Sequence, residues 1–287
     1  MQQALPRVEQ IGARPRGWLV VLDYIFYIVL IAALIGFVYY IYSFRANVAL
    51  ATPFLLQGTV VTIIISIVSM ILATILGFIG ALARLSSFAP FNWIATVYVE
   101  VIRGTPALVQ LLMWYYGIGM FLSHYLGFSP YATAFQFMTG LQSNSLVPDY
   151  FNGAFYGTLG LSFNYGAYLT EVFRSGIQSV ERGQTEASLS LGLNSAQTMR
   201  RIILPQAIRI TIPPFTNYFI TLVQDTSLLA TLSVIELEQQ TYTIAFPLID
   251  SNTKLFIFIF GALFYLAICY PLTLLSRYLE ARMAIAY

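Results

Sequence analysis

Charged residues are scarce in this sequence, and their scarcity limits the kinds of protein that it can encode. Only 9% of the 287 residues are charged and 58% are hydrophobic, whereas roughly a quarter of the residues in an average soluble domain are charged. A chain of this composition cannot cover a water-exposed surface, so most of it must lie in lipid. The 14 Lys and Arg residues against 12 Asp and Glu are too sparse and too balanced for a nucleic-acid-binding surface, which excludes nucleic acid as a partner.

Residues that form disulfides, metal sites or nucleotide sites are almost absent as well. Cys269 is the only cysteine, in an apolar run, and His124 is the only histidine. No internal disulfide and no Cys/His metal cluster can form from these residues. The single lysine, Lys254, lies outside any glycine-rich phosphate loop, so we expect no ATPase activity and no cofactor bound by this chain.

Long apolar runs dominate what is present. Each membrane-spanning helix needs about 20 apolar residues, and six windows qualify: about 18–42, 55–83, 105–123, 152–172, 211–235 and 254–276. They predict an all-α polytopic membrane protein of about six transmembrane helices. The first window is too long for a signal peptide and lacks a small-residue cleavage site, so we expect a retained anchor. Pro, Gly, Asn and Asp interrupt the third to fifth windows, which suggests that those helices face protein or a cavity.

The distribution of positive charge predicts the orientation. If both termini are cytoplasmic, twelve arginines lie on the cytoplasmic side and only Arg45 and Lys254 lie outside, as the accumulation of Lys and Arg in cytoplasmic loops requires. The outer connection, about 124–151, has no Lys or Arg, and we expect it to contain a short helix near 131–141. The inner connection, about 173–210, is rich in arginine and polar residues.

Local signals divide the inner connection into two short helices. The first covers about 185–191, and Gly192 supplies the left-handed residue that ends it. Asn194 is suited to cap the second helix, with Gln197 three residues later, and Pro205 is expected to close it. Ala187 and Leu191, with Met199, Ile202 and Ile203, are predicted to form an apolar side. The pattern alone leaves two interpretations open: helices resting on lipid headgroups, or a docking surface for a soluble partner.

The same connection carries a recognisable motif. Its residues are Glu186-Ala187-Ser188, then Gly192 after three residues, Ile202 after nine, and Leu204-Pro205 after one. This spacing resembles the Glu-Ala-Ala loop of permease subunits in binding-protein-dependent ABC importers. The runs Glu100 to Pro106 and Asp225-Thr226-Ser227 are similar to polar-amino-acid permeases of the histidine/glutamine type, and the resemblance covers about residues 52–285. Ser188 replaces the third alanine, and Gln224 stands where many relatives carry Lys.

The resemblance implies a type I ABC importer permease fold, with an N-terminal segment and additional helix in 1–50 and the permease core in 51–287. It implies that the inner loop is a coupling helix that contacts an ATPase through Glu186, Ala187, Ser188, Gly192, Leu204 and Pro205. The implied partners are two ATP-binding subunits that hold ATP and Mg, a second permease subunit (the same or a different chain) and an external or periplasmic substrate-binding protein. The implied substrate is a polar amino acid, and the implied location is the bacterial cytoplasmic (inner) membrane. Structural or gating roles fall to Glu100, Arg103, Gly104, Thr105 and Pro106.

Polar side chains inside the apolar windows suggest a translocation route. We expect it to be lined by Asp225, Thr226, Asn217, Thr221, Glu171, Thr62 and Ser66, because polar groups at membrane depth usually face protein or water. The Ser and Thr hydroxyls have an alternative, which is to bond their own helix backbone. Glu100 with Arg103, and Glu171 with Arg174, are spaced to pair on one helix face, whereas Asp225 has no such partner nearby.

Two other functions compete with this interpretation. An ion-coupled carrier also fits polytopic helices with buried carboxylates, but it leaves the motif in the inner connection unexplained. A membrane-embedded enzyme would need a constellation such as paired His or Asp motifs, which this sequence does not contain.

Overall fold

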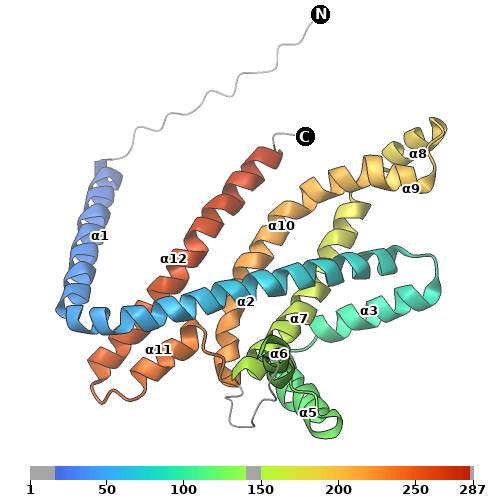
Figure 1. The fold of residues 1–287 in the computed structure, drawn as a ribbon. Coiled ribbons are helices and arrows are strands. Elements are labelled where there is room, and N and C mark those ends of the chain that lie inside the picture. The colour runs from blue at the N-terminus through green and yellow to red at the C-terminus, as the bar shows by residue number, and fades with distance from the viewer. Residues whose placement is uncertain (1–16, 140–149, 285–287) are drawn as a thin grey trace, which may run out of the picture. The chain divides into compact units, whose positions relative to one another are not determined.

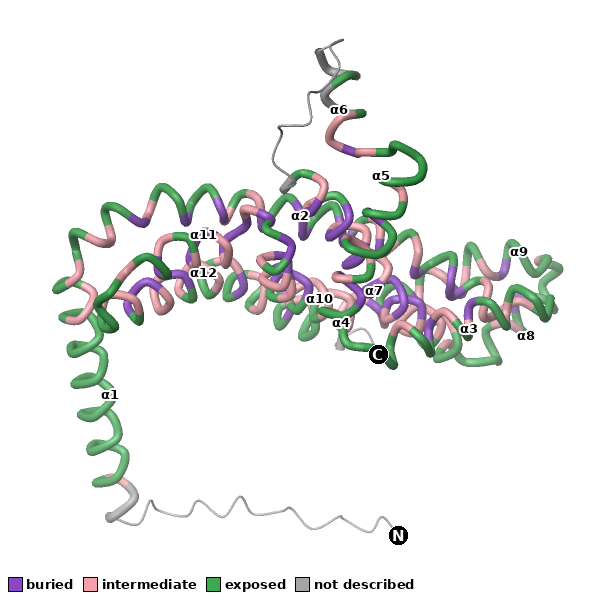
Figure 2. The backbone as a smooth tube through the Cα atoms, turned by 90° about the horizontal axis from the view of Figure 1, so that it is seen from below, coloured by how far each residue is buried: buried purple, intermediate pink, exposed green. Residues whose placement is uncertain are grey.

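The computed structural model describes residues 17–139 and 150–284, and the regular elements in these residues are helical. The chain divides into two units, 1–50 and 51–287. The first contains α1 (Gly17–Ser43), which is apolar around its circumference and whose apolar window has no buried residue (Figure 2). A helix that is hydrophobic on all sides suits a span surrounded by lipid. The assignment of residues 1–50 as an addition to a permease core stays a prediction.

The second unit is a succession of helices that differ widely in length. α2 (Arg45–Leu85) begins in the first unit and is the longest. The others are α3 (Ala89–Arg103), α4 (Ala107–Leu112), η1 (Met113–Gly119), α5 (Met120–Leu126), α6 (Pro130–Thr139), α7 (Tyr150–Gln178), α8 (Arg182–Ser190), α9 (Ser195–Thr198), η2 (Met199–Ile203), α10 (Leu204–Asp225), η3 (Thr226–Leu232), α11 (Leu237–Ala245) and α12 (Ser251–Ala284). η1 and η2 are π-helical, and η3 is a 3₁₀-helix.

The number of membrane spans depends on how bent helices are counted. Among the described residues, α1, α2 and α12 are each long and apolar enough to cross a membrane. Two bent pairs raise the count to as many as five: α3 with α4–α5, bent by 109°, and residues 195–232 with α11, bent by 51°. The predicted window 152–172 lies in α7, whose Asn, Gly, Ser, Thr and Tyr residues lower its hydropathy. Six spans therefore remain a prediction.

The core of the second unit lies where α2, α7 and α10 with η3 meet. Leu161 and Leu169 of α7 pack there with Leu222 and Leu229, all fully buried, and α10 runs beside both α7 and α12 (Figure 1). Small residues allow the closest approach: a Cβ atom at Gly80 of α2 would lie 2.3 Å from the Thr170 hydroxyl of α7. Close packing through small residues is typical of helix interfaces in membranes.

Pro205 does not end a helix, contrary to the prediction. The helix that starts at Ser195 passes through the π-helical η2 and continues as α10, with Pro205 in its first turn. The helix continues through Pro205 because the turn before it is π-helical, so the regular ladder of backbone hydrogen bonds is already altered where the proline lacks its amide. Two further prolines, Pro213 and Pro214, lie inside α10. One helical path therefore connects residues 195 and 232.

The two predicted connections lie at opposite ends of the second unit. α8 and α9 lie at the same end as the last turns of α12, whereas α5, α6 and α11 lie at the other end (Figure 1). The short helix predicted at 131–141 is confirmed as α6 up to Thr139, and residues 140–149 of the outer connection are outside the described part. The inner connection is shorter than predicted, because α7 continues to Gln178 and α10 already begins at Leu204.

Candidate coupling and transport sites

The helical ledge, defined as residues 182–198, is built as its sequence signals predict. α8 ends before Gly192, whose φ of 84° is left-handed. Asn194 Oδ1 accepts from the Gln197 amide at 2.9 Å, and Gln197 Oε1 accepts from the Asn194 amide at 3.0 Å. This capping box satisfies donors that a helix N-terminus leaves open. Both the glycine turn and the asparagine cap are confirmed, although α8 begins at Arg182 rather than near 185.

Ser188 holds the two helices of the ledge together. Its hydroxyl donates to the Thr185 carbonyl at 2.8 Å and lies 2.9 Å from the Thr198 hydroxyl. Both Ser188 and Thr198 are buried. The third residue of the Glu-Ala-Ala motif is therefore a buried contact that joins α8 to α9.

The outward side of the ledge is mixed rather than polar. Glu186 and Ala187 are exposed, and Leu191 is 83% exposed. The single apolar side that the sequence suggests does not form, because Ile203 is buried in the second unit whereas Leu191 is exposed. The exposed Glu186 carboxylate with the exposed Leu189 and Leu191 after it makes a surface suited to contact another molecule.

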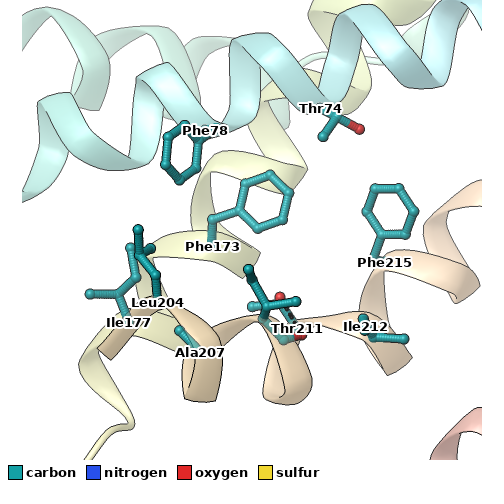
Figure 3. A pocket seen from close by; sticks show the side chains of 10 residues that line it. Thr74, Phe78, Phe173, Ile177, Leu204, Ala207, Thr211, Ile212 and Phe215 are labelled. Atoms are coloured by element: carbon teal, nitrogen blue, oxygen red, sulfur yellow. Dashed lines mark hydrogen bonds between the residues drawn. The ribbon is translucent and has the colours of Figure 1, made fainter. Parts of the chain in front are cut away.

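Leu204, the next motif residue, contributes to an apolar pocket of about 350 Å³ (Figure 3). Phe78 of α2 and Phe173 of α7 line it, with their ring centroids 6.4 Å apart. The first turns of α10 supply Leu204, Ala207, Ile208, Thr211, Ile212 and Phe215. This lining offers almost nothing for a polar ligand to bond with, and it places the start of α10 against α2 and α7. Pro205 is exposed beside it.

Glu171 is a bridge between helices. Its carboxylate accepts from Arg84 of α2 at 2.7 Å and pairs with Arg174, so the predicted Glu171–Arg174 pair is confirmed. In the part of the chain that the structure describes, Glu100 forms no ion pair with Arg103, and that predicted pair is wrong. The Arg103 guanidinium instead lies 5.4 Å from the ring centre of Tyr168, a cation–π geometry.

The segment Gly104-Thr105-Pro106 forms the sharp bend between α3 and α4. Its stability depends on Gln110, whose amide nitrogen donates to the Thr105 hydroxyl at 2.7 Å and to the Ile102 carbonyl at 2.7 Å. The Gln110 carbonyl in turn accepts from Asn164 of α7 at 3.0 Å. These bonds fix the bend and fasten it to the core, which is a structural role.

Asp225 has a partner that is 60 positions away in the sequence. The Tyr165 hydroxyl of α7 donates to Asp225 Oδ2 at 2.8 Å, and the Tyr165 ring contacts Tyr218. Of the other predicted route residues on this helix, Asn217 and Thr221 are exposed on one face of α10, and Gln224 continues that face. Thr226 is buried and donates to the Val223 carbonyl at 2.7 Å.

Thr62 and Ser66 face protein instead of an open route. Both are buried, and Ser66 donates to the Thr62 carbonyl at 2.7 Å. The Thr62 hydroxyl accepts from the Leu237 amide at 3.2 Å, which links α2 to the start of α11. This geometry favours the structural alternative for the Ser and Thr stripe.

Glu236 is the residue that the sequence reasoning missed. It is fully buried and caps α11: its carboxylate accepts from the amides of Glu238 at 2.9 Å and Gln239 at 2.8 Å. The Tyr265 hydroxyl of α12 donates to it at 2.9 Å. A carboxylate directly after an apolar window was the available signal, because an acid at membrane depth needs a helix N-terminus or another donor.

Comparison with known proteins identifies the class of this molecule. Residues 74–285 match the family described as binding-protein-dependent transport system inner membrane component. The L-cystine transport system permease protein TcyB of Bacillus subtilis (strain 168) is 36% identical over 231 residues, which are 80% of this chain and 87% of TcyB. The glutamate/aspartate import permease protein GltK of Escherichia coli O6:H1 is 35% identical over 240 residues, 83% of this chain and 97% of GltK. A crystal structure described as an amino acid ABC transporter with histidines has a TM-score of 0.66 at 28% identity, covering 83% of this chain and 97% of that one.

The chain therefore belongs to the family of binding-protein-dependent inner membrane permeases, and it is the multi-pass permease subunit of an ABC importer. The resemblance of its motifs to this family is confirmed. Permeases of the family have no catalytic activity and need no cofactor, because a separate chain hydrolyses ATP and a binding protein delivers the substrate.

Proposed function

We propose that this permease imports a polar amino acid and receives the force for transport through the helical ledge. Under this proposal, Glu186 and the exposed residues around it enter a groove on a separate ATP-binding subunit. The observation that carries the proposal is the shape of the ledge. Glu186, Ala187 and Leu189 stand exposed on α8 and Leu191 stands exposed directly after it, while the Ser188–Thr198 contact and the Asn194 cap join the parts of the ledge.

The relatives support the class of substrate. Their names assign them L-cystine, glutamine and glutamate with aspartate, which are polar amino acids with different side-chain charges. A polar amino acid is therefore the substrate class that we propose for this chain. The route includes the exposed α10 face of Asn217, Thr221 and Gln224, with Asp225 beside it. Glu171 links α2 to α7 near the cytoplasmic end of the route and contributes less to substrate contact, because Arg84 and Arg174 already neutralise its charge.

The number and kind of partner subunits follow from the parts that this chain lacks. A translocation route needs walls on all sides, and the exposed face of α10 leaves this chain open on one side. We propose that a second permease subunit, identical or different, completes the route, that two ATP-binding subunits engage the two ledges, and that an external binding protein meets the opposite end. Both termini and the ledge then lie in the cytoplasm, in agreement with the excess of arginine predicted there.

A pair of substitutions tests the two halves of this proposal separately. Glu186→Ala should reduce co-purification of the ATP-binding subunit by about tenfold, because a charge-assisted hydrogen bond is lost at the contact. Asp225→Ala should leave that association intact and abolish uptake in proteoliposomes. Glu181→Ala, which removes another exposed carboxylate of the ledge region, is the control and should change neither measurement.

The orientation needs its own measurement. A cysteine placed at Leu191, which is 83% exposed, should react with a membrane-impermeant thiol reagent in inside-out vesicles and not in intact cells. Labelling from outside would place the ledge on the wrong face and end the proposal. Normal ATPase association and uptake by Glu186→Ala would instead favour a ledge that rests on lipid headgroups.

A further inference from the structure

A polar pocket lies at the end of α10 that is farther from the ledge. Its volume is about 400 Å³, which is within the range of sites that bind small molecules. α10 and η3 contribute Gln224, Ser227, Leu228 and Thr231, α11 contributes Glu238 and Tyr242, and α12 contributes Tyr265. The exposed face of α10 leads into the pocket, because Asn217, Thr221 and Gln224 follow one another at helical spacing.

Glu238 is the one charged side chain among the residues that line this pocket, and none of them is Lys, Arg or His. It is partly buried and accepts a hydrogen bond from the Tyr242 hydroxyl. A carboxylate has about four acceptor positions, so Glu238 keeps capacity for a further donor. The pocket therefore has a negative charge and no cation in its lining to balance it.

Glu236 lies behind the pocket and supports it, but it does not serve as the ligand group. Two backbone amides and the Tyr265 hydroxyl already occupy its oxygens, and the positive end of the α11 dipole compensates its charge. The bond to Tyr265 fixes the ring of that residue in the pocket wall. Glu236 is thus a positioning residue, and Glu238 is left to meet the ligand.

The remaining lining completes a site for an amino acid with a positive side chain. The rings of Tyr242 and Tyr265 belong to its lining, and aromatic rings attract ammonium and guanidinium groups. The amide of Gln224 and the hydroxyl of Ser227 are neutral donors, which suit an α-carboxylate, whereas the Thr231 hydroxyl already donates to the Leu228 carbonyl at 2.7 Å. A glutamate ligand would bring a net negative charge towards Glu238, whereas an arginine or lysine ligand would bring a net positive one.

From this arrangement we infer that the pocket around Glu238 is a ligand site of the permease itself and that it takes amino acids with a cationic side chain in preference to neutral or acidic ones. The inference rests on the proposed function and narrows its substrate class. Gln224 contributes to this preference through its lack of charge: a lysine at this position would stand in the same pocket as Glu238 and cancel its field.

Equilibrium binding of radiolabelled arginine, glutamine and glutamate to the complete permease–ATPase complex in nanodiscs, without the binding protein, tests the preference directly. We expect arginine to bind about tenfold or more tightly than glutamine, and glutamate weakest, because only arginine brings a charge opposite to that of Glu238 and glutamate brings a like charge. Glu238→Gln keeps the acceptor for Tyr242 but removes the charge, so it should weaken arginine binding about tenfold and change glutamine binding by less than about twofold. Glu280→Gln, an equal loss of charge at an exposed position on α12, should have no effect.

Gln224→Lys supplies a second, opposite perturbation that does not depend on the folding of the Glu238 variant. It should weaken arginine binding and strengthen glutamate binding. Equal affinity for the three amino acids in the unmodified complex, or no change in preference in Gln224→Lys, would overturn the inference. If the unmodified complex still associates with the ATPase and still transports a polar amino acid, the proposed function stands without this inference. If the unmodified complex does neither, the proposed function is wrong as well.

Discussion

Replacing Glu236 by alanine should be among the single changes that most reduce the stability of the second unit, residues 51–287. The substitution removes the acceptor for three close donors, the amides of Glu238 and Gln239 and the hydroxyl of Tyr265, at 2.8–2.9 Å, and for a longer contact from the Thr62 hydroxyl at 3.5 Å. The residue is fully buried, so water cannot replace the carboxylate. Each donor left open in a protein interior costs about 1–3 kcal/mol, and hydrogen bonds within membranes have averaged about 0.6 kcal/mol with a maximum near 1.7.

The three losses together should therefore lower the free energy of unfolding by about 2–5 kcal/mol. For a unit of this size, each kcal/mol shifts the melting temperature by about 2–4 °C, so we expect a decrease of roughly 5–15 °C. Glu236→Gln keeps one acceptor oxygen for the α11 amides and should lose about half as much. The assay is the temperature at which half of the detergent-purified protein leaves its monodisperse chromatographic peak, with Glu181→Ala, an exposed carboxylate, as control.

Two outcomes would refute this reasoning. If Glu236→Ala melts within about 2 °C of the unmodified protein, then the three bonds contribute little to stability. If Glu236→Gln is as unstable as Glu236→Ala, then the charge of the carboxylate matters and its acceptor geometry does not.

Two further predictions concern packing and a helix cap. Gly58→Ala should lower the melting temperature although alanine favours helix, because its Cβ would lie 2.8 Å from Leu237 Cα and 2.9 Å from the Glu236 carbonyl oxygen, both backbone atoms. The control is Gly117→Ala, whose Cβ meets nothing within 4 Å. Equal stability of the two variants would contradict this explanation. The Thr253 hydroxyl and amide hold the pKa of the exposed Asp250 carboxyl below its ordinary value of 3.8, so its cap on α12 contributes fully above about pH 4 and is lost as the pH falls through the lowered pKa. The protection of the Thr253 amide against hydrogen exchange, relative to the intrinsic rate at each pH, should decrease in that acidic range, and unchanged protection would show that the cap contributes nothing.

Local signals were the part of this structure that the sequence revealed best. Gly192 and Asn194 act through their own backbone and through a side chain three residues away, so their roles follow from residue type and spacing. The Glu171–Arg174 pair has the same origin, since a spacing of three places both on one helix face. Pro205 was misjudged because the π-helical turn η2 just before it lets the helix continue, and nothing in the sequence showed that η2 would form.

Contacts between distant helices could not be obtained in this way. The hydrogen bond from Tyr165 to Asp225 and the bridge from Arg84 to Glu171 join residues 60 and 87 positions apart. They depend on how α2, α7 and α10 cross, and that crossing is fixed by close approaches such as the one at Gly80. The polar pocket combines residues from four elements for the same reason, and neither Glu238 nor Tyr265 stands out in its own segment.

The paired prolines of α10 determine where the helical path from 195 to 232 is easiest to bend. Neither Pro213 nor Pro214 has an amide hydrogen, so the carbonyls of Arg209 and Ile210 lose their usual donors one turn earlier. Residues 195–232 otherwise form an unbroken helical path that starts at the ledge and finishes beside the pocket. The two prolines lie near the middle of this path, so the helix is easiest to bend there, where the backbone has the fewest hydrogen bonds to lose.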